Sequence, residues 1–179
     1  LASEKMIQWV SKAYDMNYCI FRYFNVAGAD ESLEIGLKRD GLTHIIPITV
    51  QTALGLRPSM TVYGNDYPTE DGTCIRDYIH VADLAYAHVL GAKYICEKHQ
   101  SLILNLGYNH GFSVLEVIKE VEKFYPVNYT FGPRRPGDPA KLIASSQKAK
   151  EILGWVPKRS LADIVRTDIQ FRQKHEVTK

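Results

Sequence analysis

Cysteine is scarce in this chain and is not arranged for metal binding or for disulfides. The 179 residues include three cysteines, Cys19, Cys74 and Cys96, and no two of them form a Cys-x-x-Cys pair. An odd number at irregular spacing indicates neither a disulfide framework nor a zinc site. We therefore expect a protein of the reducing cytoplasm without a metal centre.

Strong charge and long apolar runs are also missing. The formal net charge is +2, and no cluster of Lys and Arg has the density of a nucleic-acid or anionic-membrane footprint, so neither partner is expected. No apolar run is long enough to span a bilayer, and the chain does not open with a basic-then-apolar signal segment. With 45% hydrophobic and 23% charged residues, the composition is that of a globular protein with one core or two small ones.

Helical and strand-like segments follow one another along the chain, which predicts an α/β fold. Apolar residues at helical spacing, capping residues and terminating glycines predict helices over residues 1–14, 45–54, 84–95, 113–124 and 146–153, with another beginning at Ser160. Short segments rich in aromatic and β-branched residues predict strands over residues 18–24, 60–63, 101–107 and 127–131. The strand at 18–24 is expected to be buried and to lead into a loop at Asn25.

The most polar stretch between two apolar segments covers residues 63–81. Gly64-Asn65-Asp66 and the segment from Pro68 to Gly72 have the composition of tight turns, so a structured loop is expected. Arg76 and Tyr78 follow it two residues apart, and in an extended segment both side chains point to one face. An anion there would meet a guanidinium and a phenol. The commoner outcome for an arbitrary arginine is a surface ion pair in a solvated loop.

Two further segments carry ligand-type chemistry. Tyr23-Phe24-Asn25 follows a predicted strand, where α/β sheets collect their ligands, although core aromatics and a turn asparagine explain it equally well. The loop Pro133–Pro139 holds two arginines between prolines and a glycine; such a loop can present bidentate donors to a diphosphate, while Asp138 can accept from ribose hydroxyls. An exposed basic turn is the alternative. His44 stands at a helix start, where a lone histidine is usually a surface or capping residue.

These segments together resemble one family, the UDP-glucose 4-epimerases (UDP-galactose 4-epimerases) of the extended short-chain dehydrogenase class. The resemblance is carried by GNDYPTEDGT at 64–73, RDYIHV at 76–81, RYFN at 22–25 and PRRPGD at 133–138. It extends over almost the whole chain. A nucleotide-sugar dehydratase or decarboxylase shares the architecture, but the first of these motifs argues against it; a non-catalytic UDP-binding module is the alternative from another class.

The resemblance implies NAD as cofactor and a UDP-sugar as substrate. Tyr23 and Phe24 would lie beside the nicotinamide. The substrate would be contacted by Asn25, His44, Ile45, Thr61, Val62, Tyr63, Arg76, Tyr78, Arg135, Asp138 and Leu142. Some relatives carry a bulky Tyr where Leu142 stands, so we hypothesise that N-acetylated hexoses are accepted as well.

The resemblance also implies a fold and a division into domains. The chain would comprise the C-terminal part of a Rossmann-type NAD-binding domain and a small α/β substrate-binding domain, interleaved in sequence. Residues 1–29 and 76–110 would belong to the first domain, and residues 30–75 and 111–179 to the second. UDP-glucose and UDP-galactose would be interconverted through a 4-keto intermediate.

The chain is expected to lack the catalytic part of such an enzyme. The family's Tyr-x-x-x-Lys pair would fall just upstream of Leu1, and no Gly-rich phosphate loop occurs in the sequence, so we assign no catalytic residue and expect this chain alone to be inactive. The complete protein is expected to be a homodimer through the helix to which residues 1–14 belong.

Overall fold

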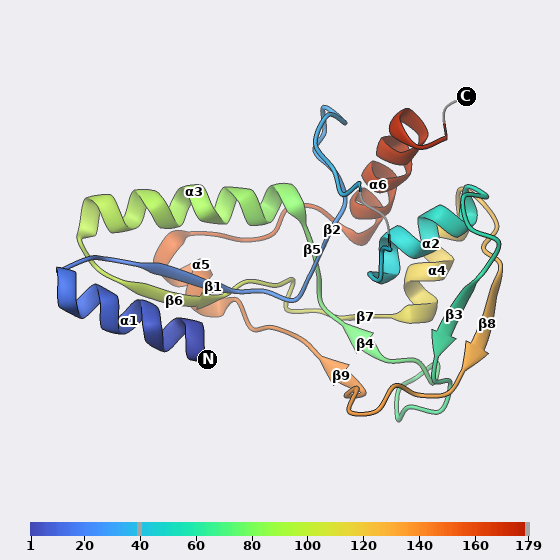
Figure 1. Cartoon of the computed structure of the whole chain (residues 1–179), viewed down its shortest axis with the longest axis horizontal. Helices are drawn as coiled ribbons and strands as arrows, with labels where there is room; N and C mark the ends of the chain where they lie inside the picture. The colour runs from blue at the N-terminus through green and yellow to red at the C-terminus, as the bar shows by residue number, and fades with distance from the viewer. Residues whose placement is uncertain (39–40, 178–179) are drawn as a thin grey trace.

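The computed structural model describes residues 1–38 and 41–177 and confirms an α/β chain (Figure 1). Its helices are α1 (Ala2–Tyr14), α2 (Ile45–Ala53), α3 (Val81–Lys98), α4 (Val114–Glu122), α5 (Gln147–Leu153) and α6 (Leu161–His175). Its strands are β1 (Cys19–Arg22), β2 (Asn25–Ala27), β3 (Met60–Tyr63), β4 (Ile75–Arg76), β5 (Tyr78–His80), β6 (Leu102–Asn105), β7 (Phe112–Ser113), β8 (Tyr129–Gly132) and β9 (Lys141–Leu142).

The helix ends follow local capping chemistry, as the sequence predicted. Ser113 and Ser160 each form a complete capping box, with Glu116 at the start of α4 and with Asp163 at the start of α6. Each box satisfies backbone N–H groups that have no partner within the helix. Gly154 ends α5 at φ 65°, a conformation that side chains with a Cβ rarely adopt.

The strands form short, mostly parallel ladders. β1 pairs with β6, β2 with β5 and β3 with β8, all in parallel, while β4 lies between antiparallel β7 and parallel β9. The predicted strand over residues 18–24 was wrong in extent and burial. β1 ends at Arg22 and none of its residues is buried, and Asn25 begins β2 because its backbone and side-chain amides donate to Asp77 O, so the chain leaves β6 and joins β5.

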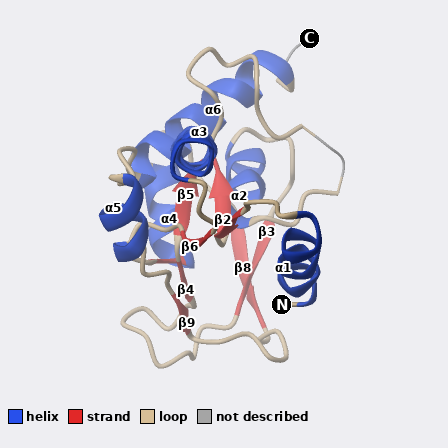
Figure 2. Cartoon of the chain, turned by 90° about the vertical axis from the view of Figure 1, so that its left-hand side faces the viewer, coloured by secondary structure: helices blue, strands red, loops and turns tan. Residues whose placement is uncertain are grey.

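Two hydrophobic cores divide the described residues (Figure 1). We call the part around the first core the cavity lobe; it contains α2, α4, α6, β3 and β8, with Ile46, Val62, Val117 and Ile164 at its centre. We call the other part the β1–β6 lobe; it contains α3, α5, β1 and β6 and is built around residues such as Leu104 and Trp155. Figure 2 shows the strands running through the middle of the molecule with helices on either side.

The strand β5 contributes side chains to both cores, because successive side chains of a strand point to opposite faces. Tyr78 packs into the core of the cavity lobe and its neighbour Ile79 into the core of the β1–β6 lobe. Both side chains are 1% exposed. The strand is thereby fixed in position between the two cores, which matters because Arg76 and Asp77 precede it directly.

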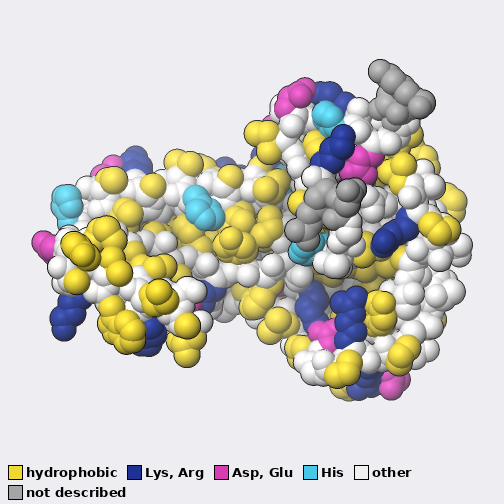
Figure 3. All heavy atoms as spheres, viewed as in Figure 1, with side chains coloured by type: hydrophobic (Ala, Val, Ile, Leu, Met, Phe, Trp, Pro, Cys, Tyr) yellow, Lys and Arg dark blue, Asp and Glu magenta, His cyan; other side chains and the backbone are white. Residues whose placement is uncertain are grey.

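The helix α1 lies against the β1–β6 lobe and buries none of its residues. Its apolar side chains Met6, Trp9 and Tyr14 are 62%, 70% and 77% exposed, and Figure 3 shows hydrophobic atoms gathered at that end of the molecule. Within the described residues, no helix is both long and apolar enough to cross a membrane.

Candidate functional site

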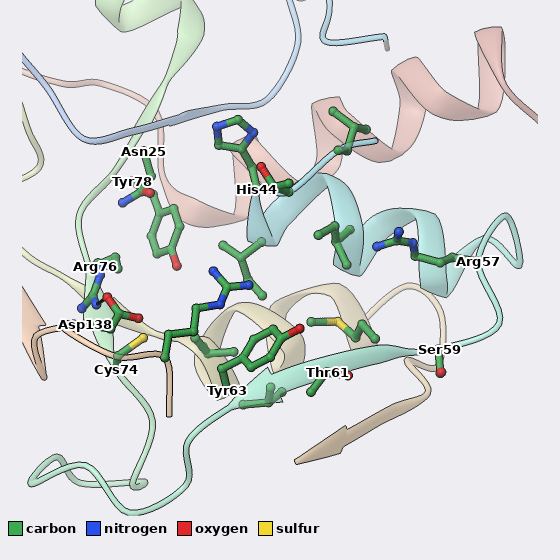
Figure 4. Close-up of a pocket in the computed structure, with 18 of the residues that line it drawn as sticks. Asn25, His44, Arg57, Ser59, Thr61, Tyr63, Cys74, Arg76, Tyr78 and Asp138 are labelled. Atoms are coloured by element: carbon green, nitrogen blue, oxygen red, sulfur yellow. Dashed lines mark hydrogen bonds and ion pairs between the residues drawn. The ribbon is translucent and has the colours of Figure 1, made fainter. Parts of the chain in front are cut away.

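The cavity lobe contains a cavity of about 720 Å³ (Figure 4), a size typical of small-molecule sites. It lies between the start of α2, strand β3, the β4–β5 segment and the loop that follows β8. The lining residues are Asn25, Leu42, Thr43, His44, Ile45, Ile48, Arg57, Pro58, Ser59, Met60, Thr61, Val62, Tyr63, Cys74, Arg76, Tyr78, Val114, Arg135 and Asp138.

The structure brings together residues that are far apart in the sequence. Ten of the eleven residues predicted to contact substrate line this one cavity: Asn25, His44, Ile45, Thr61, Val62, Tyr63, Arg76, Tyr78, Arg135 and Asp138. Leu142 does not line it; it pairs with Arg76 across β4 and β9 and is 38% exposed. Tyr23 and Phe24 also lie outside the cavity, 43% and 42% exposed between β1 and β2.

At one end of the cavity, Arg76 forms an ion pair with Asp138 through its Nη2 and Oδ1 atoms. Arg76 Nη1 also donates to the carbonyl of Ile75 at 2.7 Å. The side chains of Arg76 and Asp138 are 13% and 30% exposed, so the pair is partly shielded from water. A polyanion that entered the cavity would therefore compete with Asp138 for the guanidinium.

The loop after β8 presents its two arginines in different directions. Arg135 lines the cavity, and its guanidinium carbon lies 4.1 Å from the centroid of the Tyr63 ring. Arg134 lies over Tyr67 at 4.3 Å, and its Nε donates to Asp66 Oδ1 at 2.6 Å. Arg134 thus joins this loop to the turn after β3, while Arg135 keeps its donors in the cavity.

Asp77 fixes the segment between Arg76 and Tyr78. Its carboxylate is 1% exposed and accepts from the backbone N–H of Tyr108 at 2.8 Å and of Ala144 at 3.2 Å. Its carbonyl accepts from Asn25 Nδ2 at 2.9 Å. Burial raises the pKa of Asp77, although the backbone donors oppose the rise. The carboxylate and the carbonyl of Asp77 together therefore join three separate segments behind the cavity wall.

The opposite walls are formed by a strand and a helix end. Along β3, Thr61 and Tyr63 are exposed while Met60 and Val62 are buried, so alternate side chains face outward. His44 is the N-cap of α2, but its side chain makes no capping hydrogen bond. The first N–H groups of a helix attract acceptors and negative charge, which makes this end of α2 a suitable wall for a polar ligand.

Tyr78 contributes a neutral phenol to the wall. Burial raises its pKa well above the ordinary value for tyrosine, because the charged phenolate would lose its hydration. In Figure 4 the ring projects toward the end of the cavity where Arg76 and Asp138 lie. It can donate or accept a hydrogen bond but does not carry charge.

Several lining residues were not predicted from the sequence, among them Thr43, Arg57, Ser59 and Cys74. Arg57 follows α2 and points into the cavity in Figure 4. Its position between a predicted helix and the predicted strand at 60–63 does not by itself distinguish it from a surface arginine. The Cys74 thiol is 7% exposed, and burial raises its pKa. Among the described residues, no group of three or more metal-binding side chains could hold a metal ion.

The fold is of the α/β class, and its cavity is lined by residues that are far apart in the sequence. A family model described as GDP-mannose 4,6 dehydratase matches residues 1–167, and the chain therefore belongs to that family. The predicted fold, part of a Rossmann-type domain with a small α/β domain, is confirmed by this match and by the solved structures that resemble it.

Within the family, the chain is similar to UDP-glucose 4-epimerases. It is 46% identical to the enzyme of Lacticaseibacillus casei and 48% identical to that of Halalkalibacterium halodurans, over 98% of this chain and 54% and 53% of the relatives. A crystal structure of UDP-glucose 4-epimerase from Bifidobacterium longum, in complex with NAD+ and UDP, matches with a TM-score of 0.86 at 37% identity over 96% of this chain and 52% of that one. The chain spans about half the length of the curated relatives it matches.

Proposed function

We propose that this chain is the UDP-sugar-binding, C-terminal portion of an NAD-dependent UDP-glucose 4-epimerase that interconverts UDP-glucose and UDP-galactose through a 4-keto intermediate. The observation that supports it most is the gathering of the predicted substrate residues around one cavity. The crystallised relative from B. longum is described as a complex with NAD+ and UDP. The cavity offers the acceptors and donors that such a nucleotide needs.

The diphosphate would lie between Arg76 and Arg135. Two guanidinium groups suit a diphosphate with about two negative charges, since each can donate bidentate hydrogen bonds to phosphate oxygens. Asp138 would accept from ribose hydroxyls. The base would lie along β3, where the backbone of Thr61 to Tyr63 borders the cavity. Asn25, His44, Ile45 and Tyr78 would then enclose the sugar.

The residues present fit one edge of a dinucleotide site. Tyr23 and Phe24 offer half-exposed aromatic rings at the end of β1, where they would border a nicotinamide, but the sequence holds no Gly-x-Gly-x-x-Gly loop for the pyrophosphate. The bound cofactor would supply the hydride acceptor. What this chain contributes is the binding and orientation of the sugar nucleotide.

We further propose the domain division expected from the sequence. The parallel pairing of β1 with β6 supports joining residues 1–29 to residues 76–110, and the core of the cavity lobe supports joining residues 30–75 to residues 111–179. Within the last range, α5 and Trp155 pack with the β1–β6 core, so this part of the chain connects the two domains. A homodimer through the exposed face of α1 and a cytoplasmic location complete the proposal.

Isothermal titration calorimetry with UDP tests the proposed site. UDP should bind with measurable heat and more tightly than GDP or UMP, because the cavity is expected to select both uracil and a diphosphate. Arg135→Ala should weaken UDP binding at least about tenfold, since a hydrogen bond to a charged group contributes about 1.5–3 kcal/mol. Arg166→Ala, which removes an arginine of α6 outside the cavity, is the matched control. Equal UDP affinity in both variants would contradict the proposal.

Turnover assays address the catalytic part of the proposal. The 179-residue chain with added NAD should not convert UDP-galactose to UDP-glucose, because the proposed catalytic groups are not in this sequence. A measured turnover would refute that expectation. In the complete enzyme, turnover of UDP-N-acetylgalactosamine beside UDP-galactose tests the hypothesis about Leu142, and activity on UDP-galactose alone would sink it.

A further inference from the structure

The hydroxyl of Tyr67 is buried without a hydrogen-bond partner in the described part of the chain. The side chain is 4% exposed. Buried tyrosine hydroxyls normally find a partner, because the alternative leaves a desolvated polar atom uncompensated. An atom of this kind beside a ligand cavity therefore suggests a contact that is made in another state of the protein.

The ring of Tyr67 is held firmly in place. A Cβ on Gly64 would lie 2.5 Å from the ring, so this position, at φ 87°, admits only glycine. The Arg134 guanidinium covers the ring at 4.3 Å. Burial raises the pKa of the phenol, and the neighbouring Asp138 carboxylate and Cys74 thiol raise it further. The ring thus packs beneath the loop that carries both Arg134 and Asp138, in which Asp138 N donates to Arg135 O. Asp138 lines the cavity, so the phenol lies close to the cavity wall.

Asp138 is compensated by Arg76 in this structure. The proposed function assigns the same Arg76 to the diphosphate, so nucleotide binding would draw the guanidinium toward phosphate oxygens. The Asp138 carboxylate, whose side chain is 30% exposed, would then need another donor. The Tyr67 hydroxyl is a donor that makes no hydrogen bond within the described residues.

We propose that Tyr67 is a positioning residue for nucleotide binding: when Arg76 turns from Asp138 to the diphosphate, the Tyr67 hydroxyl donates to Asp138 and holds its carboxylate toward the ribose. The exchange explains why a buried hydroxyl is kept without a partner in the free protein. It rests on the proposed function, because it requires a nucleoside diphosphate in the cavity.

The variant Tyr67→Phe distinguishes a role in nucleotide binding from a role in packing alone. A role in nucleotide binding predicts weaker UDP binding without a loss of stability in the free chain. Removing an unpaired buried hydroxyl should leave the melting temperature of the free chain unchanged or raise it. The same substitution should weaken UDP binding, measured by calorimetry, about tenfold, equivalent to about 1.4 kcal/mol. Tyr129→Phe, on β8 outside the cavity, should leave UDP affinity unchanged.

A double-mutant cycle tests whether Tyr67 acts through Asp138. In an Asp138→Ala background, Tyr67→Phe should change UDP affinity by less than about twofold, since the shared interaction is already absent. A full tenfold loss in that background would contradict the proposed exchange. If the unchanged chain binds UDP and Tyr67→Phe binds it equally well, the inference is wrong and the proposed function stands. If the unchanged chain does not bind UDP, the proposed function itself fails.

Discussion

The two lobes differ in how completely they cover their own helices. In the cavity lobe, α6 buries eight of its residues, including the charged side chains of Asp168 and Arg172. By contrast, α1, which lies against the β1–β6 lobe, buries none and exposes Trp9 to 70%. The cavity lobe is thus closed around its own core, whereas the β1–β6 lobe presents an apolar helix face to its surroundings. The proposed ligand cavity therefore lies in the lobe whose helix α6 is well covered.

The helices α6 and α1 also differ in their ion pairs. Arg172 is 0% exposed and bonds Asp168 and Glu176, with Nε and Nη1 at 2.8 Å and 2.7 Å from their carboxylates, and it also donates to Leu37 O at 3.3 Å. This network fixes the end of α6 against Leu37. The ion pair of α1, between Glu4 and Arg22 of β1, is more exposed.

The largest effect is therefore expected from Arg172→Ala. The substitution leaves the Asp168 carboxylate buried without its partner, which costs about 3–5 kcal/mol of folding free energy. Urea unfolding followed by circular dichroism measures it. Replacing both residues, in Asp168→Leu with Arg172→Met, should recover much of the loss, because no buried charge then remains. If Arg172→Ala lost less than about 1 kcal/mol of folding free energy, the network would contribute no more than a surface ion pair does. The contrast drawn between the two lobes would then be wrong.

An intermediate effect is expected at His80, which joins the two lobes. Its Nδ1 accepts from the backbone N–H of Ala82 at the start of α3, and its Nε2 lies 3.1 Å from Thr167 Oγ1 on α6. Burial lowers the pKa of this histidine, and the positive charge of Arg159 adds to the decrease. The folded chain therefore keeps His80 neutral at a pH where the unfolded chain already binds a proton.

The sign of the resulting pH dependence follows from that difference. The contribution of neutral His80 is complete above pH about 6.5, the ordinary histidine pKa, and is lost as the pH falls through the folded-state pKa. Each unit of pKa difference corresponds to about 1.4 kcal/mol. Urea unfolding between pH 7.5 and 5 should show this decline, and His80→Gln should flatten it. An unchanged slope in the variant would assign the decline to other groups.

What could be predicted from the sequence was mostly local. Ser113 and Ser160 identify helix starts because a capping box needs only residues three apart, and Gly154 ends a helix by its own conformation. The candidate ligand residues were predicted through motif resemblance, and the cavity gathers most of them. Arg57 was missed because nothing in its immediate sequence distinguishes a cavity arginine from a surface one.

What could not be predicted depends on contacts between distant segments. The pairing of Arg76 with Asp138 joins residues on either side of α3, β6 and α4, and no spacing rule links them. Asp77 lies between two recognised motif residues, yet its role depends on the backbone of Tyr108 and Ala144. The break between β1 and β2 is likewise set by which partner strand is available, and β propensity carries no information about that.

The smallest effect is expected from the surface pair of α1 and β1. Arg22 binds Glu4 through two short contacts, Nε to Oε1 at 2.7 Å and Nη2 to Oε2 at 2.6 Å, and the hydrogen bond to Arg22 lowers the pKa of Glu4. Because the Arg22 side chain is 51% exposed, water and salt screen the pair. Arg22→Gln should therefore change the urea midpoint far less than Arg172→Ala, and less still at high salt. A loss of stability comparable to that of Arg172→Ala would mean that the β1–β6 lobe depends on α1 as strongly as the cavity lobe depends on α6. The lobes would then differ only in how much apolar surface their helices expose.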